Sequence, residues 1–173
     1  RTIRRIRAQE TNEALQYPIP ALRMLELQLT EDPLIPLQRG NTLLLTLDGQ
    51  SYEFTTNDPV ELLGQLNTFL TREDPDLILT DHGDTAIFPN LLRLARRHRV
   101  PLALDREPSP VERRIVSEGR SFFTYGKMLY HPPEYPLYGR WHIDRAHSFL
   151  FRETGFHGII ELARLAKLPV QRL

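Results

Sequence analysis

The chain has 173 residues, of which 40% are hydrophobic and 25% charged, a balance typical of a globular domain and not of a disordered or fibrous chain. Lys and Arg together number 22, as do Asp and Glu, so the net charge favours no anionic partner and any such partner must bind a local patch. The absence of Cys excludes disulfides, thiolate zinc sites and cysteine nucleophiles, and no apolar run approaches the ~20 residues of a membrane span. We therefore expect a cytoplasmic protein with no membrane partner.

The N-terminal part of the sequence separates into a connector and the first strands. Residues 1–20 contain four Arg among the first seven positions and end in YPIP, whose two prolines interrupt regular structure. We interpret this segment as a linker or the tail of a preceding N-terminal domain, with one further domain over 21–173. Alternation of apolar and polar residues over 22–29 (LRMLELQL) predicts a strand. Residues 41–49 (NTLLLTLDG) predict a second, more buried strand that ends in an Asp-Gly turn, and QSYEFTT returns as its hairpin partner.

Two helices and a buried strand are predicted next. Asp58 is a natural N-cap and Pro59 suits the first helical position, and apolar residues at helical spacing continue the helix to about residue 72. The sequence DPDLILT then predicts a short strand in the interior of the sheet. The sequence FPNLLRLARRHR predicts a helix that starts near Pro89, and the basic residues at its end are favourable for the helix dipole.

The C-terminal half is rich in aromatic residues and proline. The stretches SFFTYGKMLY and YPLYGRWHID, separated by HPPE, predict a hairpin or two exposed ribbons with a Pro-rich tip. The sequences DRAHSFLFRE and GIIELARLAK predict two helices, with Gly155 and Gly158 between them and Pro169 as the stop. Together the predicted elements indicate an α/β layer fold with a mixed sheet.

Three stretches carry a resemblance to a known family. The sequence DPDLILTDHGDTAIFPNLLRLARRHRVPL resembles the second exonuclease motif of family B DNA polymerases, whose usual wording is DPDIIxxYNGDxFDFPYLxxRA. The segment GRWHID is similar to the family's downstream GRxxxD, and LRMLELQL lies where the family has the strand of its first motif. The resemblance runs from about Leu22 to the end and is most specific between Glu73 and Pro101. It implies a ribonuclease H-like (DnaQ-like exonuclease) fold, in which a mixed sheet flanked by helices carries an inserted β-hairpin region, as in a 3′→5′ proofreading domain.

The resemblance also implies where catalytic carboxylates should lie. In the family, two divalent ions are held by an Asp-x-Glu on the first strand, an Asp in the second motif and an Asp in the third, because hard cations need carboxylate oxygens. The first strand here has Gln28 and Thr30 at those positions, or Glu26 and Gln28 in an alternative register. The second motif has His82 in place of the family's Asn and Ile87 in place of its metal-binding Asp. Three of the four carboxylates are therefore absent.

The fourth carboxylate belongs to a Tyr-x-x-x-Asp motif that would lie beyond Leu173, so we expect an exonuclease-like domain truncated before this third motif. The resemblance thus implies a fragment that has lost 3′→5′ exonuclease catalysis and serves as a structural, DNA-contacting module. Its expected partners are DNA, as primer–template or single strand, and the intramolecular polymerase domains. We expect no cofactor for this segment, although Mg²⁺ is expected for the parent polymerase.

Two alternatives remain open at this point. Asp81 and Asp84, with His82, are weak candidates for a rebuilt metal site, which would make the chain an active exonuclease with unorthodox ligands; turn and cap roles explain both acids more simply. We interpret Asp144 likewise as a helix cap. The second alternative is a protein-interaction scaffold without DNA binding. The chain's histidines fall at no zinc-binding spacing; those considered are His131, His142, His147 and His157.

Aromatic and basic residues in the second half of the chain are candidates for a nucleic-acid surface, because bases stack on aromatic rings. Members of the family carry a hairpin in this region that helps part primer from template. The candidates are Arg120, Phe123, Tyr125, Lys127, Tyr130, Tyr138 and Arg140, together with Arg96 and Arg97 at the end of the predicted helix. Packing on the sheet explains about half of the rings equally well, and Trp141 better, whereas helix stabilisation also explains the Arg cluster.

Overall fold

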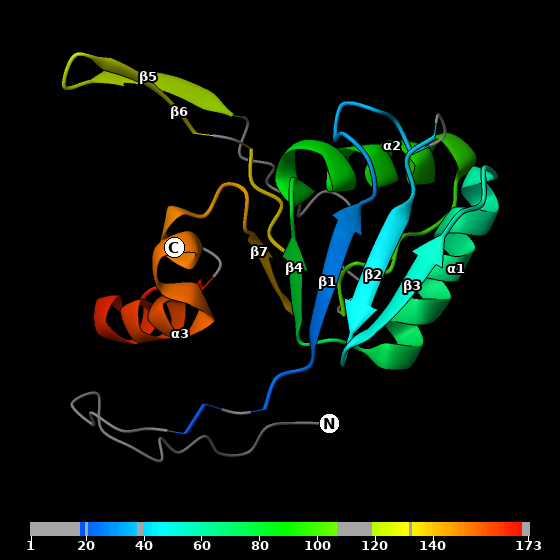
Figure 1. The fold of residues 1–173 in the computed structure, drawn as a ribbon, viewed down its shortest axis with the longest axis horizontal. Helices are drawn as coiled ribbons and strands as arrows, with labels where there is room; N and C mark the ends of the chain where they lie inside the picture. Colours follow the sequence, from blue (N-terminus) through cyan, green and yellow to red (C-terminus); the bar gives the residue numbers. More distant parts are fainter. Residues whose placement is uncertain (1–17, 20, 38–39, 107–118, 132, 171–173) are drawn as a thin grey trace.

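Within the described part of the chain, the protein forms a five-stranded mixed sheet flanked by helices and a separate two-stranded sheet (Figure 1). This computed structural model describes residues 18–19, 21–37, 40–106, 119–131 and 133–170. The α/β prediction with a mixed sheet is therefore confirmed. The linker predicted at 1–20 lies outside the described residues, apart from 18–19.

The first three strands lie where the sequence predicts them, the predicted hairpin of the second and third is confirmed, and the first pairs with the second in antiparallel order as well. They are β1 (Met24–Leu29), β2 (Leu43–Leu47) and β3 (Gln50–Phe54). Asp48 and Gly49 both have positive φ, 51° and 79°, which is the conformation of a two-residue hairpin turn that matches the twist of its strands. The Asp-Gly pair thus fixes the register between β2 and β3.

Helix α1 (Pro59–Glu73) and strand β4 (Leu77–Thr80) also lie where they are predicted. The Asp58 side chain caps α1 by accepting a hydrogen bond from the Val60 amide at 2.9 Å. Strand β4 runs parallel to both of its neighbours and all four of its residues are buried, because it occupies the interior of the sheet order β3-β2-β1-β4-β7. The predicted interior strand is confirmed.

One turn of π-helix, η1 (Gly83–Ile87), joins β4 to helix α2 (Phe88–His98). A Cβ at Gly83 would lie 2.0 Å from Thr80 Oγ1, so only glycine fits at this close approach. The sequence predicts a glycine turn and the start of α2, but the π-turn itself is not predicted. The π-turn sets where the side chains of Gly83–Ile87 point, and it buries Asp84 and Ile87.

The region between α2 and the C-terminus differs from the prediction. The hairpin consists of β5 (Arg120–Thr124) and β6 (Lys127–His131), so it closes inside SFFTYGKMLY and not at the Pro-rich HPPE. Its tip is Tyr125–Gly126, where both residues have positive φ, 47° and 74°, as a tight hairpin turn requires. The second aromatic stretch instead supplies β7 (Trp141–Asp144), which pairs in parallel with β4. The prediction of a Pro-rich hairpin tip was therefore wrong.

The two C-terminal helices predicted from the sequence are one helical run, α3 (Phe149–Ala166), interrupted at Gly155. Gly155 has φ 65° and ψ −168°, a combination open essentially to glycine alone, so the break falls at one of the two predicted glycines. The first helix starts five residues later than Asp144, because residues 145–148 form a turn that ends at the capping residue Ser148. None of the helices in the described ranges has the length and hydropathy that crossing a bilayer demands.

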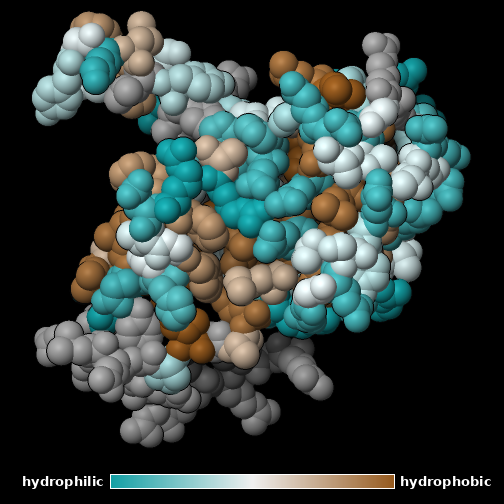
Figure 2. Space-filling view, in the orientation of Figure 1, coloured by the Kyte–Doolittle hydropathy of each residue, from teal (hydrophilic) through white to brown (hydrophobic). Residues whose placement is uncertain are grey.

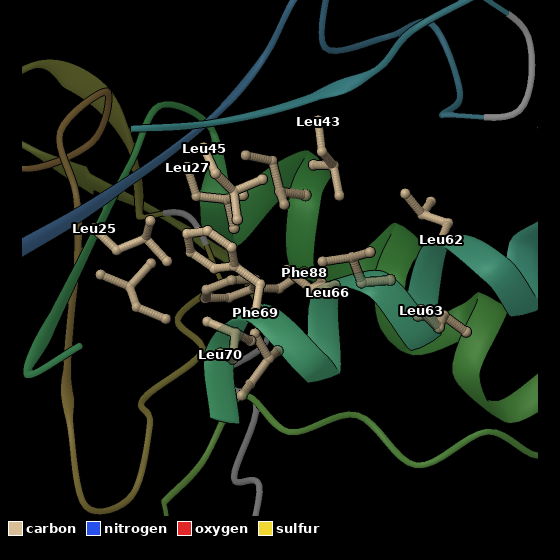
Figure 3. Close-up of a cluster of buried hydrophobic side chains, with 14 of the residues drawn as sticks. Leu25, Leu27, Leu43, Leu45, Leu62, Leu63, Leu66, Phe69, Leu70 and Phe88 are labelled. Carbon is tan, nitrogen blue, oxygen red and sulfur yellow. The ribbon is translucent and has the colours of Figure 1, made fainter. Parts of the chain in front are cut away.

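The two faces of the sheet are covered by different helices. Alternate residues of β1, such as Leu25 and Leu27, point into the main core beneath α1 and α2, where leucines and Phe69 and Phe88 interlock (Figure 3). The opposite face of β4 and β7 packs against α3 through a smaller apolar cluster that includes Leu79. Figure 2 shows hydrophobic surface over α3 and a hydrophilic surface beside it, toward the carboxyl ends of β1 and β4.

Candidate functional site

Parallel pairing aligns three polar residues at the carboxyl ends of β1, β4 and β7. Leu27 pairs with Thr80, and Thr80 with Asp144, so the next residues, Gln28, Asp81 and Arg145, continue one row across the sheet. Successive residues of a strand point to opposite faces, which puts this row on the face turned away from the main core. The alignment brings together residues that lie more than 50 positions apart in the chain.

The row is tied together by the Arg145 guanidinium. Arg145 Nε and Nη2 donate to the two carboxylate oxygens of Asp81 at 3.1 and 2.9 Å, and Nη1 donates to Glu26 Oε2 at 2.9 Å. The Gln28 amide donates to Asp81 Oδ2, also at 2.9 Å. Burial lowers the pKa of Arg145, but the hydrogen bonds to Asp81 and Glu26 outweigh it, so the pKa lies above its ordinary value. A permanent cation therefore sits between the two acids.

The other two positions matched to metal ligands point elsewhere. Thr30 Oγ1 lies 2.9 Å from Thr42 Oγ1, so its hydroxyl belongs to the β1–β2 edge. Ile87 is completely buried in the main core beneath the sheet. Neither side chain presents an oxygen to Asp81. On the face turned away from the main core, Glu26 and Asp81 are the acids that contact Arg145.

Asp144 organises the π-turn from the core side of the sheet. Its carboxyl group accepts hydrogen bonds from the backbone amides of His82 and Asp84, each at 3.0 Å, and from Ala146 at 3.1 Å. The His147 ring nitrogen Nδ1 lies 3.0 Å from Asp144 Oδ2. Asp144 therefore holds the backbone of η1, and the prediction that it caps the following helix was wrong, because Ser148 does so.

Asp84 and His142 form a buried polar pair next to this turn. Asp84 Oδ1 accepts a hydrogen bond from the Tyr135 amide at 2.7 Å and lies 3.7 Å from His142 Nδ1. Burial raises the pKa of Asp84 to about 7, against the lowering effect of the Tyr135 amide. Burial also lowers the pKa of His142 to about 4, and its Nε2 lies 2.9 Å from Thr80 Oγ1. The network ties the segment after β6 to the turn before α2.

These residues do not fit a pair of divalent ions. Such ions require several converging anionic oxygens. Gln28 offers an amide whose nitrogen faces Asp81, and Ile87 offers only carbon inside the core. Asp81 and Asp84 do not converge, since Asp81 binds Arg145 on one face whereas Asp84 is buried beside His142. Among the residues that the structure describes, no group of three or more His, Asp or Glu side chains is arranged to hold a metal.

A second candidate site is the hairpin β5–β6, which projects from the body of the fold (Figure 1). Phe123 pairs across the strands with Met128, and Ser121 with Tyr130, so these four side chains share one face of the ribbon. Phe123 is 70% exposed and Tyr125, at the tip, is 100% exposed. Arg120 and Lys127 lie on the opposite face, and the sequence 119–131 contains no acid. The hairpin is therefore exposed, with Phe123 on one face and, on the other, Phe122 between the cations Arg120 and Lys127.

The remaining candidates for nucleic-acid contact lie outside the hairpin. Arg96 and Arg97 are exposed in the last turn of α2. Tyr138 is half-buried, and its backbone amide donates to Asp105. Arg140 is buried, with Asp74 3.5 Å from its guanidinium, so its side chain forms no part of an exposed surface. Trp141 lies in β7 and packs near Phe156 of α3, as a packing role predicts: the two ring centres are 6.4 Å apart.

Comparison with known proteins adds a structural likeness. No family model and no curated protein sequence matches the chain. Over 89% of its length the chain is similar to the structure of the family B DNA polymerase from the hyperthermophilic archaeon Pyrobaculum calidifontis, with 19% sequence identity and a TM-score of 0.48. The chain spans about a fifth of that polymerase, covering 20% of its length. A likeness at this level assigns no activity, so the site rests on the geometry described above.

Sequence reasoning missed the central residue of the site. Arg145 directly follows GRWHID, and its charge opposite two acids becomes visible only once β7 is known to pair with β4. One signal in the sequence could have indicated it. A residue that directly follows a buried parallel strand lies at the carboxyl edge of the sheet, and Asp81 and Arg145 both occupy such a position.

Proposed function

We propose that the chain is an exonuclease-like module of a family B-type DNA polymerase, with a ribonuclease H-like fold, that lacks 3′→5′ exonuclease catalysis and contacts DNA. The sheet supports the choice of fold, since an antiparallel β1–β3 unit joined to parallel β4 and β7 and flanked by helices is the mixed architecture that the resemblance implies. DNA contact rests mainly on one observation, the exposed aromatic and cationic hairpin β5–β6.

The loss of nuclease chemistry is supported by the residues at the matched positions. A nuclease of this class needs several carboxylates around two ions, and here an amide, a hydroxyl and an aliphatic side chain stand at Gln28, Thr30 and Ile87. The surviving acids, Glu26 and Asp81, are paired with Arg145. A positively charged guanidinium at this place repels a second cation.

The hairpin supports contact with unpaired bases. A two-stranded ribbon alone is marginally stable in water, and this one leaves Phe123, Tyr125 and Tyr130 exposed. Aromatic rings of this kind stack on bases, each stack contributing ~1–3 kcal/mol, while Arg120 and Lys127 supply charge for phosphates. Bases within a duplex are already stacked on each other, so the partner favoured by this chemistry is single-stranded DNA or a single-stranded end.

Fluorescence anisotropy with a labelled single-stranded oligonucleotide tests the contact. The double variant Phe123→Ala/Tyr125→Ala should raise the dissociation constant at least about tenfold, because two stacks are lost. Phe149→Ala removes a comparably exposed ring from α3 and serves as the matched control, which should bind like the original chain. If the original chain shows no binding even at low salt, the proposal of DNA contact fails and the scaffold alternative stands.

The nuclease part is tested separately. We expect the chain to leave an end-labelled single strand intact in the presence of Mg²⁺ or Mn²⁺. Shortening of the strand that disappears in Asp81→Ala/Asp84→Ala would establish the alternative, an active exonuclease with unorthodox ligands, whatever the result for DNA binding.

A further inference from the structure

The carboxyl end of the central strands holds a guanidinium between two carboxylates. The Arg145 side chain is only 20% exposed and makes three charge-assisted hydrogen bonds, two to Asp81 and one to Glu26. The acids come from different strands, β1 and β4, and Arg145 follows a third strand, β7. One side chain thus connects all three parallel strands of the sheet at the level of Gln28.

We propose that Arg145 is the built-in counter-ion of the Glu26–Asp81 pair, in the place of a divalent cation, and that removal of its charge leaves a dicarboxylate that binds one. The inference rests on the non-catalytic part of the proposed function and is independent of the hairpin, because none of the residues involved belongs to β5 or β6.

The geometry explains why a divalent cation can take the place of the guanidinium. Glu26 and Asp81 both lie within 2.9 Å of the same guanidinium, so without it two negative charges face each other across a partly buried gap. A small divalent ion with oxygen ligands relieves this repulsion as a guanidinium does. The Gln28 side chain already contacts Asp81 through its amide nitrogen. When the amide group turns, its oxygen supplies a third ligand, a neutral one, beside the two carboxylates.

The geometry also explains why arginine is preferred to lysine here. The planar guanidinium presents parallel donors to both oxygens of Asp81 and keeps a third nitrogen for Glu26. A lysine ammonium carries the same charge but cannot form this fork. Arg145→Lys therefore keeps the repulsion toward a metal ion while losing part of the connection between the strands.

Titration with Mn²⁺, followed by the electron paramagnetic resonance signal of the free ion, tests the proposal. The original chain should remove no Mn²⁺ from solution at this site, whereas Arg145→Gln should bind about one ion per chain in the ~0.1–1 mM range of weak, partly exposed oxygen sites. The melting temperature of Arg145→Gln should be lower than that of the original chain in metal-free buffer and should rise when Mn²⁺ or Mg²⁺ is added.

Two further variants serve as controls. Arg145→Gln/Asp81→Asn removes the acid that Arg145 contacts with two nitrogens and should lose the Mn²⁺ binding gained by Arg145→Gln. Arg145→Lys keeps the positive charge and should bind none. Absence of Mn²⁺ binding by a folded Arg145→Gln overturns the proposal. So does binding by the original chain that Asp81→Asn abolishes, a result that decides the matter even if Arg145→Gln does not fold. Intact binding of single-stranded DNA alongside either result leaves the hairpin proposal standing.

Discussion

The buried pair of Asp84 and His142 gives the fold opposing responses to pH. Burial raises the pKa of Asp84 from 3.8 to about 7, so the stability it contributes is full below pH 3.8 and is lost as pH rises through 7. Burial lowers the pKa of His142 from 6.5 to about 4, so its contribution is full above pH 6.5 and is lost as pH falls through 4. Between pH 4 and 6.5 the two slopes have opposite signs and offset each other.

Replacing Asp84 with Asn should expose the slope of His142. Relative to the original chain, the free energy of unfolding of Asp84→Asn should increase as pH rises from 4 to 7, by up to about 1.4 kcal/mol per pH unit. Asn keeps an oxygen for the Tyr135 amide, so the variant should still fold. Urea denaturation at half-unit steps of pH measures the difference. A difference that stays flat over this interval contradicts a burial-shifted Asp84.

Ile87 tests the proposed loss of nuclease chemistry at the level of one residue. Its side chain has no exposed surface and lies in the main core. Ile87→Asp therefore places a carboxylate among leucines, where it does not join Asp81 in a metal site. We expect this variant to lose roughly 3–5 kcal/mol of stability and to gain no nuclease activity. Ile87→Val, which only removes a methyl group, should lose about 0.5–1.5 kcal/mol. Chemical denaturation compares them, and a stable Ile87→Asp would show that residue 87 can reach solvent.

Two helical glycines differ in role at the scale of the elements. Gly155 interrupts α3 with φ 65° and ψ −168°, a conformation that side chains with a Cβ avoid, so Gly155→Ala should destabilise the fold by about 1–3 kcal/mol. Gly64 lies in the middle of α1, is exposed, and has nothing within 4 Å of an added Cβ. Gly64→Ala should therefore stabilise the fold by about 0.5–1 kcal/mol. Thermal denaturation should shift in opposite directions for the two variants; shifts of the same sign contradict the conformation at Gly155.

Elements whose order comes from local chemistry were predictable from the sequence. The Asp58 cap, the Asp48–Gly49 turn and the alternation around Leu25 and Leu27 each act within a few residues, and the structure confirms all three. The hairpin tip was misplaced, because Tyr125–Gly126 reads less clearly as a turn than the proline pair beside it. Tyr125 adopts positive φ, which sequence preferences for Asn or Asp at such positions do not anticipate.

The candidate site was less predictable, because it depends on pairing between distant segments. Arg145 meets Asp81 only through the parallel register of β4 and β7, 64 positions apart, and no local pattern specifies which strand follows β4 in the sheet. The role of Asp144 is hidden for the same reason, since its carboxyl group holds the backbone of a π-turn 60 positions earlier. The burial of Arg140 is hidden for the same reason: the charge of its side chain suggests an exposed position, and only tertiary packing shows that it is buried.

At the scale of the whole molecule, equal numbers of acidic and basic residues make any attraction to DNA local. Binding to a single strand should therefore depend on salt only through the cations that meet phosphates, with a slope of log K against log salt of about −0.7 for each contact. Contacts from Arg120 and Lys127 alone give a slope near −1.4. Participation of Arg96 and Arg97 as well gives a slope near −2.8.

Anisotropy titrations at four salt concentrations separate these cases. We expect a slope near −1.4 in the original chain and a slope close to zero in Arg120→Gln/Lys127→Gln, because these two cations belong to the hairpin that carries the exposed rings, on its opposite face. Arg96→Gln/Arg97→Gln serves as the charge-matched control and should leave the slope unchanged. These two residues lie in the last turn of α2, where their charges stabilise the helix by interacting with its dipole. A slope that survives the hairpin substitutions but falls in the α2 variant would place the phosphate path along the end of α2, and the hairpin would then contact bases without guiding the backbone.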